Sequence, residues 1–161
     1  NIDLTLSNIM GLVHDYMSSD KKWLYQPDFA SEPEEVDKEQ FADMMKDYCY
    51  SFYALGTPAS YEAFRKISEL MLEKNPDKAG FMNNIGSYHM LVKKDFKTAV
   101  KYYSKVLKKQ PDDYTAIKNS VLAARRMGNV KLEKKYLQML VQHGTESERL
   151  QAKARLEMLD K

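Results

Sequence analysis

The sequence is poor in the residues that break or cross-link a chain. Its 161 residues include only six Gly, five Pro and one Cys. Because Gly and Pro are the main breakers of regular structure, their scarcity favours long helices over short strands joined by tight turns. The single cysteine, Cys49, excludes an internal disulfide framework and a metal site built from several cysteines.

Long apolar runs are missing as well. No stretch reaches the roughly 18 apolar residues that a membrane-spanning helix needs, and the N-terminal residues lack the basic-then-apolar order of a secretory signal. We therefore expect a soluble chain without a membrane span. Because it begins at Asn1 and not at Met, a removed signal would allow a periplasmic or other extracytoplasmic location beside a cytoplasmic one.

Charge is unevenly distributed along the chain. Acidic residues exceed basic ones in residues 1–60, whereas basic residues exceed acidic ones in residues 61–161. Three interpretations remain open: the two halves attract each other, the basic half attracts an acidic partner, or the charges lie on solvated helix faces.

One stretch, Ala79 to Asp113, has the pattern of a helix–turn–helix repeat unit. The spacing W-x2-L-G-x2-Y followed by A-x3-F and P is matched by Met82, Ile85, Gly86, His89, Ala99, Tyr103 and Pro111. In this respect the chain resembles the tetratricopeptide repeat family. One extra residue within Val92–Asp95 lengthens the turn between the two helices relative to that pattern.

The same pattern recurs on both sides of this stretch. Tyr61 and Phe96 are 35 residues apart, and so are Pro76 and Pro111. A third unit begins at Tyr114. We therefore predict a repeat region over residues 38–142, with units at 38–78, 79–113 and 114–142.

An N-terminal segment, residues 1–37, precedes the repeats. Apolar spacing predicts a helix from Leu4 to Met17 with Asp3 as its N-cap. Residues 18–37 form an acidic arm, and we expect its aromatic residues to pin it to the body of the protein. An alternative is that this arm partly occupies the binding groove.

Capping signals define the later helices. Asp37 with Gln40 predicts a helix over about 38–55, and Thr145 with Glu148 predicts a C-terminal capping helix within residues 143–161. Between them, Gly144 is expected to end the second helix of the third unit as a C′ residue.

The resemblance implies an all-α fold, a right-handed superhelix of stacked antiparallel helix pairs. It also implies a non-catalytic scaffold that binds a peptide or protein segment on the concave helix face. Projecting the family's inward positions onto this sequence gives candidate partner-binding residues: Tyr50, Tyr53, Asn83, Asn84, Ser87, Met90, Leu91, Lys118, Leu122, Arg125 and Arg126. The alternative function is a structural or regulatory module of a larger protein, self-associating as a weak homodimer or remaining a monomer.

The chemistry of the partner is suggested by Arg125 and Arg126. A guanidinium binds carboxylate in a bidentate manner, which suits an acidic or C-terminal segment. The alternative is that both arginines stabilise the C-terminus of their own helix. The carboxylate clamp found in part of the family is only half matched, by Asn84 and Lys46. Thr115 and Asn119 stand where that clamp has basic residues, so we do not expect clamp binding.

Signals of other functions are absent from the sequence. It has no glycine-rich phosphate loop, nucleophile elbow or HExxH motif, and its His14, His89 and His143 are far apart. We therefore expect no enzymatic activity, no cofactor and no metal. Cys49 lies on an apolar helix face, which predicts a buried, inert thiol. Interleaved Lys and Glu after residue 130 make nucleic acid an unfavoured partner.

Overall fold

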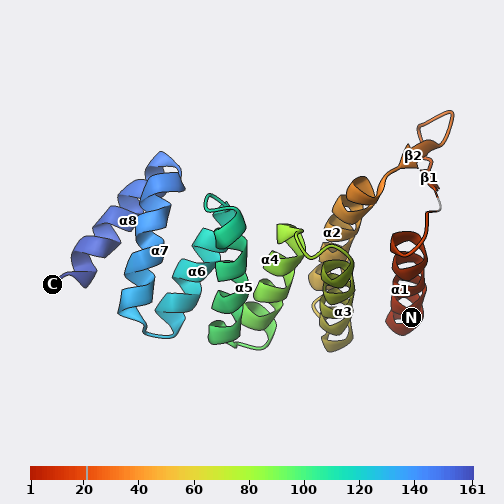
Figure 1. Cartoon of the computed structure of the whole chain (residues 1–161). Helices are drawn as coiled ribbons and strands as arrows, with labels where there is room; N and C mark the ends of the chain where they lie inside the picture. The colour runs from red at the N-terminus through yellow and green to blue at the C-terminus, as the bar shows by residue number, and fades with distance from the viewer. Residues whose placement is uncertain (21) are drawn as a thin grey trace. The chain divides into compact units, whose positions relative to one another are not determined.

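The computed structural model describes residues 1–20 and 22–161. These residues contain eight α-helices in the order expected from the sequence, and the all-α fold of successive helix pairs is confirmed. The chain divides into two compact units, Asn1–Phe81 and Met82–Lys161, and the boundary falls within α4. In each unit, helices that are neighbours in the chain follow one another (Figure 1). The described residues include no helix long and apolar enough to cross a membrane.

The first unit contains three long helices and a short β-ribbon. The helices are α1 (Ile2–Met17), α2 (Lys38–Leu55) and α3 (Pro58–Lys74), and α3 packs against both of the others. Strands β1 (Trp23–Tyr25) and β2 (Glu34–Val36) pair antiparallel, with Trp23 opposite Val36. The sequence did not predict these strands, because three-residue strands are too short to show a periodic pattern.

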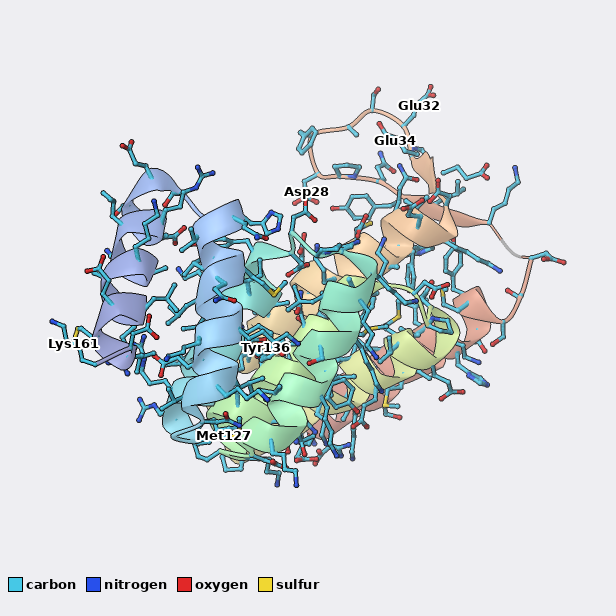
Figure 2. The ribbon with its side chains drawn as sticks, turned by 60° about the vertical axis from the view of Figure 1, so that its left-hand side comes forward. Asp28, Glu32, Glu34, Met127, Tyr136 and Lys161 are labelled. Atoms are coloured by element: carbon cyan, nitrogen blue, oxygen red, sulfur yellow. The ribbon has the colours of Figure 1, made fainter. Side chains whose placement is uncertain are left out.

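The arm between α1 and α2 is held where Trp23 pairs with Val36 at one end of the β-ribbon. The Trp23 ring lies 4.6 Å from that of Phe41 and 5.7 Å from that of Tyr16, and the Tyr16 hydroxyl donates to the carbonyl of Val36. The expectation of pinning is thus correct for Trp23. It is wrong for Phe29, which is 93% exposed in the segment between the two strands, where Asp28 and Glu32 also lie (Figure 2). Residue 21 of the arm lies outside the described residues.

The second unit is a run of helices that pack in chain order. It contains most of α4 (Ala79–Ser87), a π-helical turn (Tyr88–Val92), α5 (Phe96–Lys109), α6 (Tyr114–Arg126), α7 (Val130–His143) and α8 (Glu146–Leu159). Helix α6 packs against α5 and α7, and α7 packs against α8. Its core includes fully buried Tyr103, Ile117 and Tyr136.

The 35-residue offset is visible in the backbone after α3 and α5. Asn75 and Gln110 precede the two prolines and have nearly the same conformation, with φ/ψ of −133°/73° and −131°/83°. Each then accepts a hydrogen bond from the amide three residues later, at 3.0 Å in both turns. A residue before proline is restricted to extended conformations, so the same sequence signal produces the same turn.

The extra residue in the second repeat is absorbed by a π-helical turn. The amide of Asp95 donates to the carbonyl of His89, whereas at the corresponding place in the next pair Asn129 donates to Ala124. The first hydrogen bond spans one residue more than the second. Both turns then use a positive φ, 56° at Lys94 and 64° at Gly128.

Most helix boundaries follow from the capping residues. The capping boxes Asp37/Gln40 and Thr145/Glu148 are confirmed. The N-cap of α1 is Asn1, not Asp3, because the Asn1 side chain accepts from the Asp3 amide at 3.0 Å. Gly144 does not take the expected left-handed C′ conformation, since its φ is −76°. Glycine is required there for space: a Cβ would lie 2.6 Å from the carbonyl oxygen of Leu140.

Candidate functional site

One face of α6 remains open to solvent after its inner face is buried against α5 and α7. Its residues combine an aromatic ring, an aliphatic side chain and cations at the spacing of neighbouring helical turns. We call this set the α6 stripe: Tyr114, Lys118, Leu122, Arg125 and Arg126. Four of the five are candidates from the sequence, and Tyr114 is added by the structure.

At its N-terminal end the α6 stripe is organised by Glu148 of α8. The Tyr114 hydroxyl donates to the Glu148 carboxylate, and Nζ of Lys118 lies 3.3 Å from Oε1 of Glu148 and 4.8 Å from the Tyr114 ring centroid. The hydrogen bond from Tyr114 and the amide of Thr145 lower the pKa of Glu148 to about 2. The pKa of Lys118 is raised, first by its own hydrogen bond with Tyr114 and then by its hydrogen bond with Glu148.

At the other end, Arg125 is held by a buried carboxylate. Its Nε lies 2.9 Å from Oε1 of Glu133 on α7, and Nε of Arg155 on α8 lies 2.9 Å from the same oxygen. Glu133 is only 2% exposed. The hydrogen bond from Arg155, followed by that from Arg125, lowers the pKa of Glu133. One guanidinium of the expected basic corner therefore has a structural role.

Leu122, which lies between these ends, and Arg126, which follows Arg125, have no such role. Leu122 is 39% exposed, and within the described part of the chain Arg126 takes part in no hydrogen bond or ion pair. The exposed part of Leu122 and the Arg126 side chain are therefore open to a partner.

The candidates on α4 and its π-helical extension are largely closed to solvent, contrary to the expectation of an open surface. Asn83, Asn84, Ser87 and Met90 are all buried. The polar ones have partners inside the protein. Nδ2 of Asn83 lies 3.2 Å from the Asp113 carboxylate, and the Ser87 hydroxyl lies 3.2 Å from that of Tyr103. Only Leu91 keeps substantial exposure.

Tyr50 and Tyr53 belong to an aromatic cluster between α2 and α3. The Phe64 ring lies 5.8 Å from that of Tyr50 and 5.4 Å from that of Tyr53, and Tyr61 lies 5.5 Å from Tyr53. Burial is the first cause that raises the pKa values of both tyrosine hydroxyls. The rings hold the helix pair together, although Tyr50 keeps an exposed edge.

Groups able to perform chemistry are not assembled among the described residues. No three His, Cys, Asp or Glu side chains there are arranged to hold a metal ion. Cys49 is fully buried, and this burial raises the pKa of its thiol to about 12, as expected of an inert cysteine.

Sequence reasoning missed Glu133 and Glu148 as organising residues. A signal for Glu133 was present, because it shares the inner face of α7 with Tyr136, Leu137 and Leu140 at helical spacing. A carboxylate at a core position requires a cation nearby. Glu148 was interpreted only as the second residue of the capping box, so its contact with Tyr114 was not expected.

Comparison with known families gives one match in the second half of the chain. Residues 87–157 match the family described as the TT21 fifth ARM repeats domain. Comparison with curated proteins gives no match. The matched residues run from the end of α4 into α8 and cover less than half of the chain. This part of the protein is therefore similar to a helical-repeat domain, a class of stacked helices that present extended binding surfaces.

Proposed function

We propose that the chain is a non-catalytic scaffold that binds an extended segment of another protein on the α6 stripe. The observation that carries the proposal is the open face of α6. Aromatic, aliphatic and guanidinium groups are exposed there side by side, and such residues are enriched where proteins contact one another. The α4 candidates are closed, so the stripe replaces the broader surface expected from the sequence.

We further propose that residues 38–142 are tetratricopeptide-like. The units α2/α3, α4/α5 and α6/α7 each contain two helices, and the turns after α3 and α5 repeat with a 35-residue offset. In this family the first helix of each pair faces the ligand, which agrees with a stripe on α6. The domain limits 1–37, 38–142 and 143–161 belong to the same proposal.

The test uses substitutions at the two residues of the stripe that take part in no hydrogen bond or ion pair among the described residues. Peptides that bind the whole chain are selected from a random displayed library, and their affinities are compared between the native chain and Leu122→Asp and Arg126→Glu. We expect each substitution to weaken binding by about tenfold or more. Arg125→Glu is unsuitable, because it would place a carboxylate beside the buried Glu133. Lys153→Glu on α8 is the charge-matched control.

Binding that is unchanged in both variants would overturn the proposal. So would a stable dimer in sedimentation that Leu122→Asp dissociates, because the stripe would then be a self-association surface. That result would favour the alternative of a self-associating structural or regulatory module.

A further inference from the structure

The second helices of the last two pairs carry a surface of one charge. Helix α5 contains five lysines and no acidic residue. Its Lys97, Lys101, Lys105 and Lys108 recur at spacings of three and four, so they lie along one exposed side. On α7, Lys131 and Lys135 are exposed in the same way, while the acidic Glu133 is buried and paired. No exposed carboxylate on either helix offsets these cations.

One lysine of each helix, Lys108 on α5 and Lys135 on α7, lines a groove between the two helices. A hollow of about 170 Å³ lies between α5 and α7, lined by Ser104, Leu107, Lys108, Lys135, Tyr136 and Met139. The hydroxyls of Ser104 and Tyr136 are 3.0 Å apart, which joins the helices at its floor. Figure 2 shows Tyr136 on the side of α7 that faces the neighbouring helices.

A second, more open hollow continues along α7. It has a volume of about 700 Å³ and includes Val130, Leu132, Lys131 and Lys135. Lys135 lines both hollows. Val130 is nearly half exposed. We call the lysines of α5 and α7 together with these hollows the lysine face.

The composition of the lysine face selects among polyanions. Single-stranded nucleic acid is bound mainly by stacking on exposed aromatic rings, but on these helices Tyr136 is buried and Tyr102 is partly covered. An apolar groove with lysines on both sides instead matches carboxylates that flank an apolar side chain.

We propose that the lysine face binds an acidic polypeptide segment that inserts an apolar side chain between α5 and α7. Ammonium groups on both sides of the groove attract the carboxylates, and Leu107 and Met139 contact the anchor residue. The inference is independent of the α6 stripe, which lies on another helix and uses other side chains.

The test measures fluorescence anisotropy of the whole chain with a labelled peptide of glutamates around a central leucine. We expect Lys105→Glu combined with Lys135→Glu to weaken its binding by at least about tenfold. The same peptide with alanine in place of leucine should bind more weakly, as should Met139→Glu with the original peptide. Affinity should also fall as salt rises, since exposed charges are screened.

Lys66→Glu combined with Lys153→Glu, on helices α3 and α8, changes the net charge by the same amount as the double lysine variant and should leave binding unchanged. Circular dichroism verifies folding of each variant. Tighter binding of duplex DNA or anionic vesicles than of the peptide would overturn the proposal. Self-association abolished by the same two lysine substitutions would also overturn it, because a second copy would then occupy the face.

Discussion

Gly86 on α4 lies against the ring of Tyr103 on α5, so closely that a Cβ on Gly86 would come within 2.7 Å of Cε1 of Tyr103. Tyr103 is fully buried and its hydroxyl interacts with Ser87. The ring therefore cannot move aside without losing core packing. These are two of the positions through which the sequence resembles a tetratricopeptide repeat, and the contact gives that spacing its physical cause.

Gly86→Ala is expected to lower the free energy of unfolding by about 1–3 kcal/mol, because the added methyl overpacks the core. Urea titration followed by circular dichroism measures the change. Gly11→Ala is the matched control: Gly11 lies inside α1 with no atom within 4 Å of the added Cβ. There the substitution should stabilise by roughly 0.5–1 kcal/mol. Equal effects at the two sites would contradict the explanation.

Glu133→Ala is expected to destabilise the chain by about 1–3 kcal/mol, since it removes the carboxylate that both Arg125 and Arg155 contact. The two guanidinium groups are partly exposed and can regain water, which limits the loss. Thermal unfolding measures the effect. Arg126→Ala, next to Arg125 but without an ion pair among the described residues, should change stability by no more than about 0.5 kcal/mol. A larger effect at Arg126 than at Glu133 would refute this account.

Lys94→Gly is expected to raise the free energy of unfolding by up to about 1 kcal/mol. Lys94 has a positive φ of 56°, which costs a non-glycine residue roughly 1–2 kcal/mol, although glycine loses more entropy on folding. The equivalent turn already uses glycine, so Gly128→Lys should destabilise by a similar amount. The denaturant midpoint should rise for Lys94→Gly and fall for Gly128→Lys. Shifts of the same sign in the two variants would disprove this explanation.

The free energy of unfolding should begin to fall at a pH above the folded-state pKa values of the carboxyl groups. The pKa values of Glu148, Glu133 and Asp95 are lowered in the folded chain, to about 2 for Glu148. The contribution of these carboxylates to the free energy of unfolding is complete at pH values above the ordinary carboxyl pKa. It is lost as the pH falls through the folded-state pKa. Unfolding free energies measured from neutral pH down to about pH 2 should therefore decline below about 4.5. Glu148→Gln should flatten that decline.

The Cys49 thiol should not react with iodoacetamide in the native chain. Its pKa of about 12 leaves almost no thiolate at neutral pH, and the side chain is fully buried. Labelling followed by mass spectrometry should show modification only in denaturant. Rapid labelling without denaturant would mean that α2 separates from α3 in solution.

The sequence predicted the helices well because most helix boundaries are determined by residues that are close together in the chain. Asp37, Thr145 and the prolines after α3 and α5 mark boundaries through hydrogen bonds or steric limits that need no tertiary contact. Predictions about surface were weaker. Whether the side chain of Asn83 or Arg125 is already engaged inside the protein depends on Asp113 and Glu133, which lie 30 and 8 residues away. Periodicity within one helix contains no information about such partners.

The carboxylate of Glu133 also bears on how the second unit comes apart. Through Arg125 and Arg155 it joins α6, α7 and α8, so the separation of α6 or of α8 from α7 breaks an ion pair with a buried carboxylate. Stacked arrays often fray from an end, one element after another. Here the last three should be lost together, as a single cooperative block, and native-state hydrogen exchange would then report one common opening energy for all of them.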